Sequence, residues 1–325
     1  MKLTIVIPVY NVEKYIERCI KSALDQGLSE DIYEILIIDD ESPDNSMKIV
    51  HKIAENSPAL RVISQKNKGL GGARNTGIKN AFGDYILFLD SDDYLNPNVL
   101  NNLLKIGLEN QLDILDFGAR GVNEKGETVY TVEHLLRSKV SDGPNYFKDG
   151  FHQSACVRLY KRDFLLENKL IFREKVYVED VEFNFKAVFL AKRIIATNMI
   201  ISNFVQTTGS ITRSSNSEKN KKLILDILDA IKRIDRFSKE VITKKSVAYG
   251  KAREKVNEQT ITLLKILFLK SKDLSLFNQV VGELKCMNLY PSKFRSKNRK
   301  RQLFKVFSNN GWFYSQCYKL KRAVT

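Results

Sequence analysis

Four short, nearly continuous apolar runs recur through the first hundred residues of the chain. They are rich in β-branched side chains and span residues 3–9, 33–40, 60–65 and 84–90. Runs of this kind are typical of strands buried on both faces of a parallel sheet. The stretches between them carry apolar residues at helical spacing, and the first of these stops at Gly27. The alternation predicts an α/β domain with a mainly parallel sheet flanked by helices.

Polar side chains follow each predicted strand directly. Because ligands bind beyond the carboxyl ends of parallel strands, we expect these side chains to share one rim of the sheet. An aromatic ring can stack on a base, a carboxylate can accept from a base N–H, and an arginine can neutralise phosphate. The set suits a nucleoside diphosphate with a divalent cation, and it comprises Pro8, Tyr10, Asn11, Asp39, Asp40, Arg74, Asp90, Ser91, Asp92 and Asp93.

A glycine-rich stretch, KNKGLGGARNTG at residues 66–77, follows the third predicted strand. It is not a dinucleotide fingerprint, because it lacks the G-x-G-x-x-G spacing, and it is not a P-loop, because no G-K-[ST] closes it. We interpret its glycines, Gly69 among them, as letting the chain pass close beneath a nucleotide before a short helix. Oxygen ligands from Asp90 or Asp92 would suit Mg²⁺ or Mn²⁺, which bridges phosphate oxygens.

Each of these features also has a purely structural interpretation. A D-x-D triplet is common in surface loops, Tyr10 would serve as a packing aromatic, and the acidic pair after the second strand would cap the next helix. A later pair, Glu179-Asp180, begins a periodic helix, where acidic residues are stabilised by the helix dipole. The functional interpretation of the strand-end residues is favoured because each follows a predicted strand on the same rim.

Five blocks of the sequence together resemble the family 2 glycosyltransferases, which have a GT-A fold. The blocks are TIVIPVYNVEKYIERCIKSALDQ, IIDDESPDNS, NKGLGGARNTGIKNAFGDYILFLDSDDYL, LYKRDFLLENKLIF and VYVEDVEFNFKAVFLAKRI. The resemblance implies a Rossmann-like, nucleotide-sugar-dependent transferase domain over residues 1–212, usually acting on UDP-sugars. Its nucleotide-sugar half would span residues 1–110 and its acceptor half residues 111–212.

The resemblance also implies roles for the strand-end residues. Asp39 would accept a hydrogen bond from the uracil N–H. Asp92 would bind the metal directly, and Asp90 would lie beside it, nearer the ribose. The rest of the nucleotide-sugar site would come from Pro8, Tyr10, Asn11, Gly69, Arg74 and Ser91.

The block VYVEDVEFNF carries the implied catalytic residues. By the resemblance, Asp180 is the catalytic base and Glu179 supports placement of the acceptor. The reaction would be a single displacement with inversion, in which Asp180 takes the proton of an acceptor hydroxyl and metal charge stabilises the UDP leaving group.

Two departures from the family pattern stand out. The segment SNFVQTTGSITR has Phe204 and Gln206 where tyrosine and arginine are frequent, which puts cationic help for the diphosphate from that strand in question. Glu41 replaces the glycine that is common after the acidic pair, and we expect this to change the loop conformation rather than the chemistry.

The texture of the chain changes after residue 212. Residues 213–325 carry apolar side chains at helical spacing and predict a basic, helical C-terminal domain. From Ile201 onward there are 27 Lys and Arg against 9 Asp and Glu, or +18, whereas the first 200 residues sum to −3. Such basicity beside apolar residues suits an anionic membrane surface, a partner glycosyltransferase or a nucleic-acid backbone; the plain alternative is a solvated helix face.

Cysteine usage and hydropathy bear on localisation. The four cysteines are far apart without a C-x-x-C pair, so they indicate neither a zinc site nor a disulfide framework. No stretch approaches the roughly 18 apolar residues of a membrane-spanning helix. We expect a cytoplasmic protein, or a peripheral one on the inner face of the cell membrane.

Three functions compete for this sequence. The first is a metal-dependent inverting glycosyltransferase that moves glucose, galactose or an N-acetyl form from a UDP-sugar to a lipid-linked saccharide or to the O-glycan of a serine-rich adhesin. The second, an NAD-dependent oxidoreductase, requires G-x-G-x-x-G where the chain has PVYN. The third, a nucleic-acid-binding protein, lacks a reading module, so no nucleic acid partner is expected.

Overall fold

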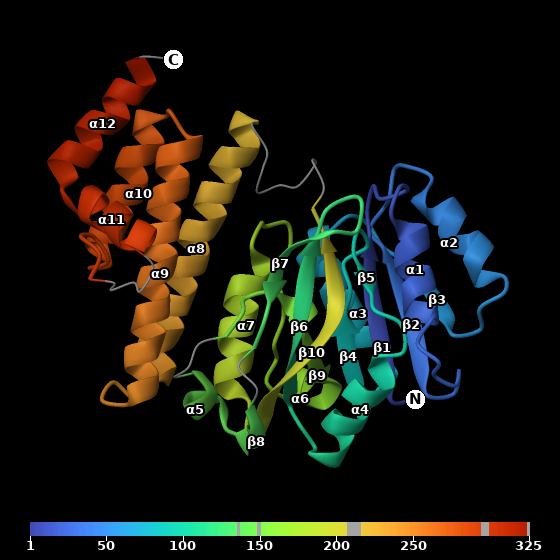
Figure 1. The fold of residues 1–325 in the computed structure, drawn as a ribbon. Coiled ribbons are helices and arrows are strands. Elements are labelled where there is room, and N and C mark those ends of the chain that lie inside the picture. The colour runs from blue at the N-terminus through green and yellow to red at the C-terminus, as the bar shows by residue number, and fades with distance from the viewer. Residues whose placement is uncertain (135–136, 148–150, 207–215, 294–298, 324–325) are drawn as a thin grey trace. The chain divides into compact units, whose positions relative to one another are not determined.

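The computed structural model describes residues 1–134, 137–147, 151–206, 216–293 and 299–323. The chain forms two compact units, Met1–Thr208 and Gly209–Thr325 (Figure 1). The predicted domain boundary at residues 212–213 lies outside the described residues, and so do residues 207–213 of the segment SNFVQTTGSITR.

A parallel block of four strands forms the first half of the sheet in the N-terminal unit. Its order is β3-β2-β1-β4, and the register pairs Val9 with Asp39 and Val6 with Phe88. These strands match the apolar runs, which confirms the predicted α/β fold. Their bounds are β1 (Leu3–Val9), β2 (Tyr33–Asp39), β3 (Leu60–Ser64) and β4 (Tyr85–Phe88).

The second half of the sheet is mixed. The short strand β9 (Arg158–Lys161) lies antiparallel between β4 and β6, while β6 and β10 are parallel to each other. A strand of four residues has too little periodicity to be predicted from sequence. The remaining strands are β5 (Tyr94–Leu95), β6 (Ile114–Val122), β7 (Thr128–Val132), β8 (Arg137–Ser141) and β10 (Ile194–Val205).

Helices cover both faces of this sheet. The odd-numbered side chains of β1 form a buried cluster with α1 and α4, whereas Val6 on the opposite face lies against α3. A side chain added at Gly77 would place Cβ 2.3 Å from Val6 Cγ1, so this glycine lets α3 approach the sheet closely. The helices are α1 (Ile16–Leu24), α2 (Ser46–Ala54), α3 (Gly69–Asn80), α4 (Leu100–Glu109), α5 (Gly143–Phe147), η1 (Ala155–Val157), α6 (Arg162–Glu167) and α7 (Glu179–Leu190).

The C-terminal unit is helical throughout its described residues, as predicted. Side-chain caps begin three of its helices: Asn216, Ser246 and Asp273 each accept from backbone N–H groups of the first turn. No helix in the described part of the chain is long and apolar enough to cross a bilayer. The helices are α8 (Ser217–Val241), α9 (Val247–Lys270), α10 (Leu274–Cys286), α11 (Arg299–Asn309) and α12 (Gly311–Ala323).

Candidate active site

The carboxyl ends of β1, β2 and β4 meet at one edge of the sheet. Backbone hydrogen bonds continue past the strands, because Asp40 N donates to Val9 O at 3.0 Å and Leu89 N donates to Val6 O at 3.0 Å. The strand-end residues predicted to share a rim therefore follow strands that are in register with one another.

A buried arginine joins this edge to helix α7. Arg74 Nη2 donates to Asp90 Oδ1 and Arg74 Nη1 donates to Glu179 Oε1, both at 2.6 Å. The Arg74 side chain is only 3% exposed, and its guanidinium lies near the rings of Phe88 and Phe172. Burial disfavours the charged guanidinium, but the Asp90 carboxylate raises the pKa of Arg74 well above its usual range, so the group stays charged.

These contacts indicate what Arg74 does. Both terminal nitrogens donate to protein carboxylates that lie far apart in the sequence, so the side chain fixes Asp90 against Glu179. The sequence-based prediction of a direct contact between Arg74 and the nucleotide stays a prediction. The geometry favours a positioning role for the arginine beneath the site.

Helix α7 presents the acidic pair from its first turn. Val178, the residue before the helix, has φ 56° and ψ 34°, a left-handed conformation that is strained for a β-branched side chain. Strain of this kind concentrates at functional sites. The conformation of Val178 thus starts α7 abruptly at Glu179 and Asp180, beside Arg74.

The electrostatic environment tunes Asp180. Burial, and then the charge of Glu179, raises the pKa of Asp180 to about 7, although Arg74 acts in the opposite direction. Burial also raises the pKa of Glu179, against the lowering effect of Arg74. A carboxylate with a pKa near neutrality is suited to proton transfer at physiological pH. No raised pKa was expected for Asp180 from the sequence, because its neighbours in space are invisible there.

The D-x-D loop follows β4 and is held from two sides. Arg18 Nη2 donates to Asp92 O at 3.3 Å, and Val205 N donates to Asp93 Oδ1 at 2.7 Å. Asp93 is buried, and burial followed by the charges of Asp92 and Asp90 raises its pKa. Asp93 thus ties the loop to β10 and leaves Asp90 and Asp92 as the candidate ligands.

The donor set of this loop fits a divalent cation. Burial, and then the charge of Asp90, raises the pKa of Asp92 to about 6, which shows acidic crowding that a cation would relieve. Among the described residues, no three His, Cys, Asp or Glu side chains are arranged to hold a metal by themselves. Mg²⁺ and similar ions commonly take one or two carboxylates from the protein and the rest from substrate phosphates.

The two aspartates at the end of β2 make different contacts. Asp39 is half-buried and accepts from Ser42 N at 2.9 Å, whereas Asp40 is 2% exposed. Asp40 accepts from the backbone N–H groups of Lys68 and Gly69, each at 2.8 Å. We did not predict from the sequence that Asp40 anchors the glycine stretch. The only signal for this contact was an acidic pair at the end of one strand and a glycine-rich stretch after the next strand.

The glycine stretch itself differs from expectation. Its glycines lie within α3, which begins at Gly69, rather than in a loop before a helix. A Cβ at Gly71 would lie 2.0 Å from Arg173 O, and one at Gly69 would lie 3.2 Å from the backbone of Lys175. The space left by the missing side chains is thus taken by the segment that leads into α7. Close backbone packing outweighs the low helix propensity of glycine here.

The residues after β1 have different exposures. Pro8 is buried within the strand, while Tyr10 is 51% exposed. Asn11 adopts a left-handed φ of 56°, and its N–H donates to Ser42 Oγ at 2.9 Å. The exposed ring of Tyr10 is compatible with base stacking. Ser91 is buried between the two candidate metal ligands, so its side chain is less accessible than the sequence implied.

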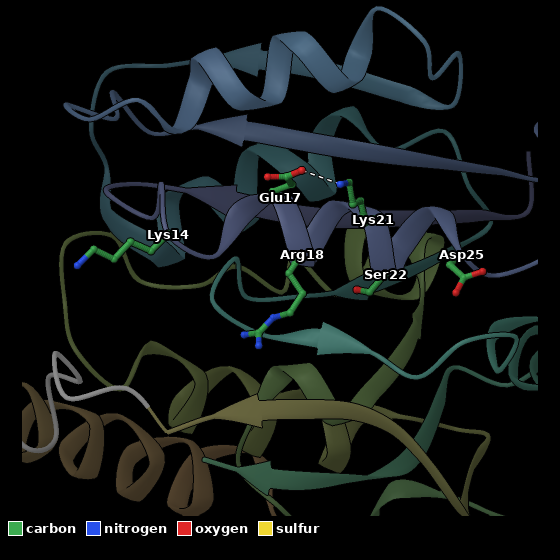
Figure 2. A pocket seen from close by; sticks show the side chains of 6 residues that line it. All are labelled: Lys14, Glu17, Arg18, Lys21, Ser22 and Asp25. Atoms are coloured by element: carbon green, nitrogen blue, oxygen red, sulfur yellow. Dashed lines mark hydrogen bonds and ion pairs between the residues drawn. The ribbon is translucent and has the colours of Figure 1, made fainter. Parts of the chain in front are cut away.

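A surface hollow of about 520 Å³ lies along α1. Figure 2 shows that its lining side chains all come from α1 or the turns beside it, and that Lys21 and Glu17 pair with each other across its upper edge. The Arg18 side chain lines this hollow and also contacts the D-x-D loop. Its guanidinium lies 4.5 Å from the centre of the Tyr94 ring. The hollow does not include the carboxylate cluster, so it is not the candidate donor site. Its lining is Lys14, Glu17, Arg18, Lys21, Ser22 and Asp25.

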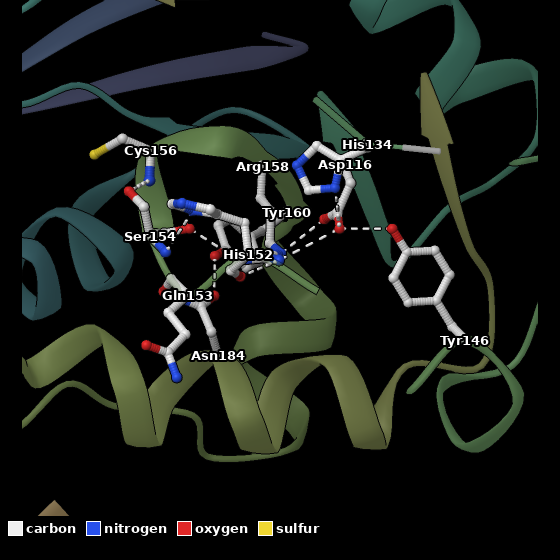
Figure 3. A network of polar contacts seen from close by, with 10 residues as sticks. All are labelled: Asp116, His134, Tyr146, His152, Gln153, Ser154, Cys156, Arg158, Tyr160 and Asn184. Carbon is white, nitrogen blue, oxygen red and sulfur yellow. Dashed lines mark hydrogen bonds and ion pairs between the residues drawn. The ribbon is translucent and has the colours of Figure 1, made fainter. Parts of the chain in front are cut away.

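A buried polar network holds the segment 152–154 in place (Figure 3). Arg158 Nε lies 2.7 Å from Asp116 Oδ1, and both side chains are fully buried. The guanidinium of Arg158 also donates to the carbonyls of His152 and Ser154. The network therefore fixes the segment 152–154 from below. A charged residue inside each of two apolar strands was the available sequence signal, and it was missed.

The same segment is tied to helix α7. Asn184 Nδ2, on α7, donates to Gln153 O at 2.6 Å, and Tyr160 donates to the side-chain oxygen of Asn184. The imidazole of His152 is exposed, so the side chain is accessible beside the site. Residues 148–150, which precede this segment, lie outside the described residues.

Comparisons with known proteins agree with this architecture. Residues 1–349 of S. aureus TarS, solved with UDP-GlcNAc, superpose with a TM-score of 0.60 at 20% identity, covering 100% of this chain and 93% of that one. A mannosyltransferase from Pyrobaculum calidifontis, solved with GDP-Man and Mn²⁺, gives a TM-score of 0.55 at 15% identity, covering 99% of this chain and 87% of that one. The N-terminal unit is thus an α/β domain of the GT-A class.

Sequence similarity then gives the family. The sequence model of the family described as glycosyl transferase family 2 matches residues 4–168, about half of the chain. The chain belongs to glycosyltransferase family 2. EpsJ of Bacillus subtilis, an uncharacterised glycosyltransferase, is 36% identical over 200 residues, which are 59% of this chain and 57% of EpsJ. The poly(ribitol-phosphate) beta-glucosyltransferase of Bacillus spizizenii is 35% identical over 60% of this chain and 30% of that protein. The chain thus spans less than two thirds of either relative.

Proposed function

We propose that this chain transfers a hexose, glucose, galactose or an N-acetyl form of either, from a UDP-sugar to a hydroxyl of a bacterial surface glycan. The observation that carries the proposal is the cluster in which Arg74 joins Asp90 of the D-x-D loop to Glu179 of α7. This contact brings the candidate leaving-group site and the candidate base together across the sheet edge. The TarS complexes with UDP and UDP-GlcNAc support a uridine donor.

The donor would lie across the carboxyl ends of the strands. Tyr10 would stack on the uracil. Asp39 accepts from Ser42 N with one carboxylate oxygen, and its other oxygen would accept a hydrogen bond from the uracil N–H. A divalent cation bound at Asp92 would supply positive charge for the diphosphate leaving group. The pocket would be completed by Pro8, Asn11, Gly69, Asp90 and Ser91.

The chemistry would be a single displacement with inversion. Asp180 would accept the proton of the acceptor hydroxyl while that oxygen forms a bond to the anomeric carbon. The bond between that carbon and the phosphate oxygen breaks, and UDP leaves with the electron pair. Burial, and then the charge of Glu179, raises the pKa of Asp180 to about 7. Glu179, held by Arg74, would orient the first turn of α7.

Binding of the donor nucleotide gives the first test. UDP with Mn²⁺, at a UDP concentration of about 100 times its Kd, is expected to raise the melting temperature of the N-terminal unit by about 5–10 °C. Chelation by EDTA, or Asp92→Asn, should remove most of this shift. Asp84→Asn is the matched control, because Asp84 pairs with Lys2 on the surface at the opposite ends of the strands. A shift in melting temperature that persists in EDTA would contradict the assignment of a metal to Asp92. UDP release measured across UDP-sugars would then identify the donor.

The pH profile gives a second test. Because the base must be unprotonated, kcat/KM should rise with pH through about 7 and level off above it. Glu179→Gln removes the negative charge that raises the pKa of Asp180, so the rise should move to lower pH.

A matched variant on the same helix controls this test. Glu182→Gln changes a carboxylate that pairs with Lys186, and it should leave the position of the rise unchanged. An upward move of the profile in Glu179→Gln would contradict the proposed coupling between Glu179 and Asp180.

The acceptor is proposed to be a lipid-linked saccharide or the O-glycan of a serine-rich protein, glycosylated in the cytoplasm. The relatives support the surface-glycan class: the B. spizizenii protein and TarS are both named as poly(ribitol-phosphate) glycosyltransferases. The Asp116–Arg158 network places the segment 152–154 beside α7, where an acceptor would meet Asp180.

A further inference from the structure

The last two helices carry an exposed apolar face. Five large apolar side chains on α11 and α12 are between 46% and 72% exposed. On α11, Arg299, Leu303 and Val306 are four and three residues apart, so they share one side of the helix. We call the exposed apolar set the outer face; it comprises Leu303, Val306, Trp312, Phe313 and Leu320.

The inner side of the same helices is fully occupied. The Phe307 ring lies 5.3 Å from Phe268, and the Tyr318 ring lies 4.5 Å from Phe277. Tyr314, fully buried, donates its hydroxyl to Leu264 O at 2.7 Å. These contacts hold α11 and α12 on α9 and α10. The outer face therefore stays exposed although the core of its own unit is formed. It is left over after the core has been made.

The charged residues of α11 and α12 themselves have one sign. After Glu283 the chain contains no Asp or Glu, and residues 284–325 hold 11 Lys and Arg. Arg299, Lys300 and Lys319 are exposed on the two helices, and Arg301 is paired with Glu258 of α9. Exposed aromatic and aliphatic side chains are thus set among cations with no acidic residue between them.

We propose that the outer face of α11 and α12 docks on an anionic lipid bilayer. Large exposed apolar patches mark interaction sites, and an apolar face edged by Lys and Arg is the pattern of interfacial helices. Lipid chains would cover Trp312 and Leu320, while anionic headgroups would meet Lys300 and Lys319. A nucleic-acid backbone would satisfy the cations but leave the apolar side chains in water. Because no described helix can cross a bilayer, this attachment would be peripheral.

Docking would matter for the proposed function but does not depend on it. If the acceptor is lipid-linked, attachment raises the local concentration of acceptor around the enzyme. The binding measurement below uses no sugar donor. Failure of glycosyl transfer would leave the docking result standing, and loss of docking would leave transfer to a soluble acceptor intact.

The chain contains a single tryptophan, which reports on this face directly. Trp312 is 72% exposed, so its emission in buffer is that of a hydrated indole. Vesicles of phosphatidylglycerol and phosphatidylcholine are expected to shift the emission to shorter wavelength, and brominated lipid chains to quench it. Pure phosphatidylcholine should produce a much smaller change, and added salt should weaken the response to the anionic vesicles.

Matched variants separate this face from general basicity. Lys300→Gln with Lys319→Gln should weaken partitioning by about fivefold for each lysine. Lys244→Gln with Lys245→Gln removes two exposed lysines between α8 and α9 and should leave partitioning nearly unchanged. Leu320→Ser should weaken binding, whereas Val247→Ser, at a site of similar exposure on α9, should not.

Three outcomes would overturn the proposal. They are an unchanged Trp312 emission with anionic vesicles, an equal response to neutral vesicles, and an equal loss in the control variants. An unchanged emission would favour a protein partner for this face. Circular dichroism and UDP binding, both measured without vesicles, should match wild type for all of the surface variants.

Discussion

Replacing Asp180 with asparagine is expected to lower kcat by about 10²–10⁴-fold, the usual contribution of a positioned general base. The amide has nearly the same shape but cannot accept the proton of the acceptor hydroxyl. Affinity for UDP should change little, because the nucleotide would contact the strand ends rather than α7. Steady-state transfer and calorimetric UDP binding, measured on the same preparation, test this expectation.

The control for Asp180→Asn is the neighbouring carboxylate Glu182. Glu182 pairs with Lys186 one turn along α7, so Glu182→Gln should retain most of the transfer activity. Combined loss of UDP binding and transfer in Asp180→Asn would show that Asp180 belongs to the nucleotide site. Full activity in Asp180→Asn would remove it from the mechanism.

Arg74→Ala is expected to have the largest combined effect on stability and activity. Removing one partner of a buried ion pair typically costs about 3–5 kcal/mol, because charges are left buried without compensation. Arg74 is 3% exposed and Glu179 is 8% exposed, which places them in that class. Without the guanidinium, Asp90 and Glu179 would repel each other, and the geometry between the D-x-D loop and α7 would be lost. Thermal unfolding and kcat should both fall.

Two comparison variants make this prediction specific. Arg74→Lys keeps the charge but lacks the fork that donates to two carboxylates, so it should rescue stability more than activity. Arg61→Ala breaks another arginine–glutamate pair of the same unit, Arg61 with Glu34, near the amino ends of β3 and β2 and away from their carboxyl ends. Arg61 is a third exposed, so this variant should lose less stability and keep its kcat. A wild-type kcat in Arg74→Ala would contradict the positioning role.

The site couples electrostatics to backbone geometry. Val178 bends the chain through a left-handed residue, and the next two residues are the acidic pair whose carboxylates lie near Arg74. Strain at one residue and desolvation of two acids are costs that the fold must offset elsewhere. Packing at α7 includes the stacked rings of Phe172 and Phe183, whose centroids are 3.7 Å apart.

Much of the catalytic unit was predictable because its signals are local. The apolar runs at residues 3–9 and 33–40 gave β1 and β2 nearly to the residue, and the D-x-D followed β4 as expected. Continuous apolar stretches identify buried strands because each such residue must be covered on either face of the sheet. The helical nature of the C-terminal unit followed from apolar spacing in the same way.

Other features escaped prediction because they depend on contacts between distant residues. The partners Arg74 and Glu179 are 105 residues apart, and Asp40 with Gly69 are 29 apart. No spacing rule links such positions. The four-residue strand β9 and the start of α3 at Gly69 were missed because neighbours in space, rather than local preference, decide those structures.

The sequence by itself determined the alternation of strands and helices in the first hundred residues, the acidic strand ends and the basic, acid-free end of the chain, because these are set by the type and spacing of residues. Only the tertiary structure decided that Arg74 is buried between two carboxylates, that Asp180 has a pKa near 7, and that the apolar residues of α11 and α12 divide into a packed side and an exposed one. Burial, desolvation and charge pairing arise when segments far apart in the sequence come together, and they therefore have no counterpart in the order of residues.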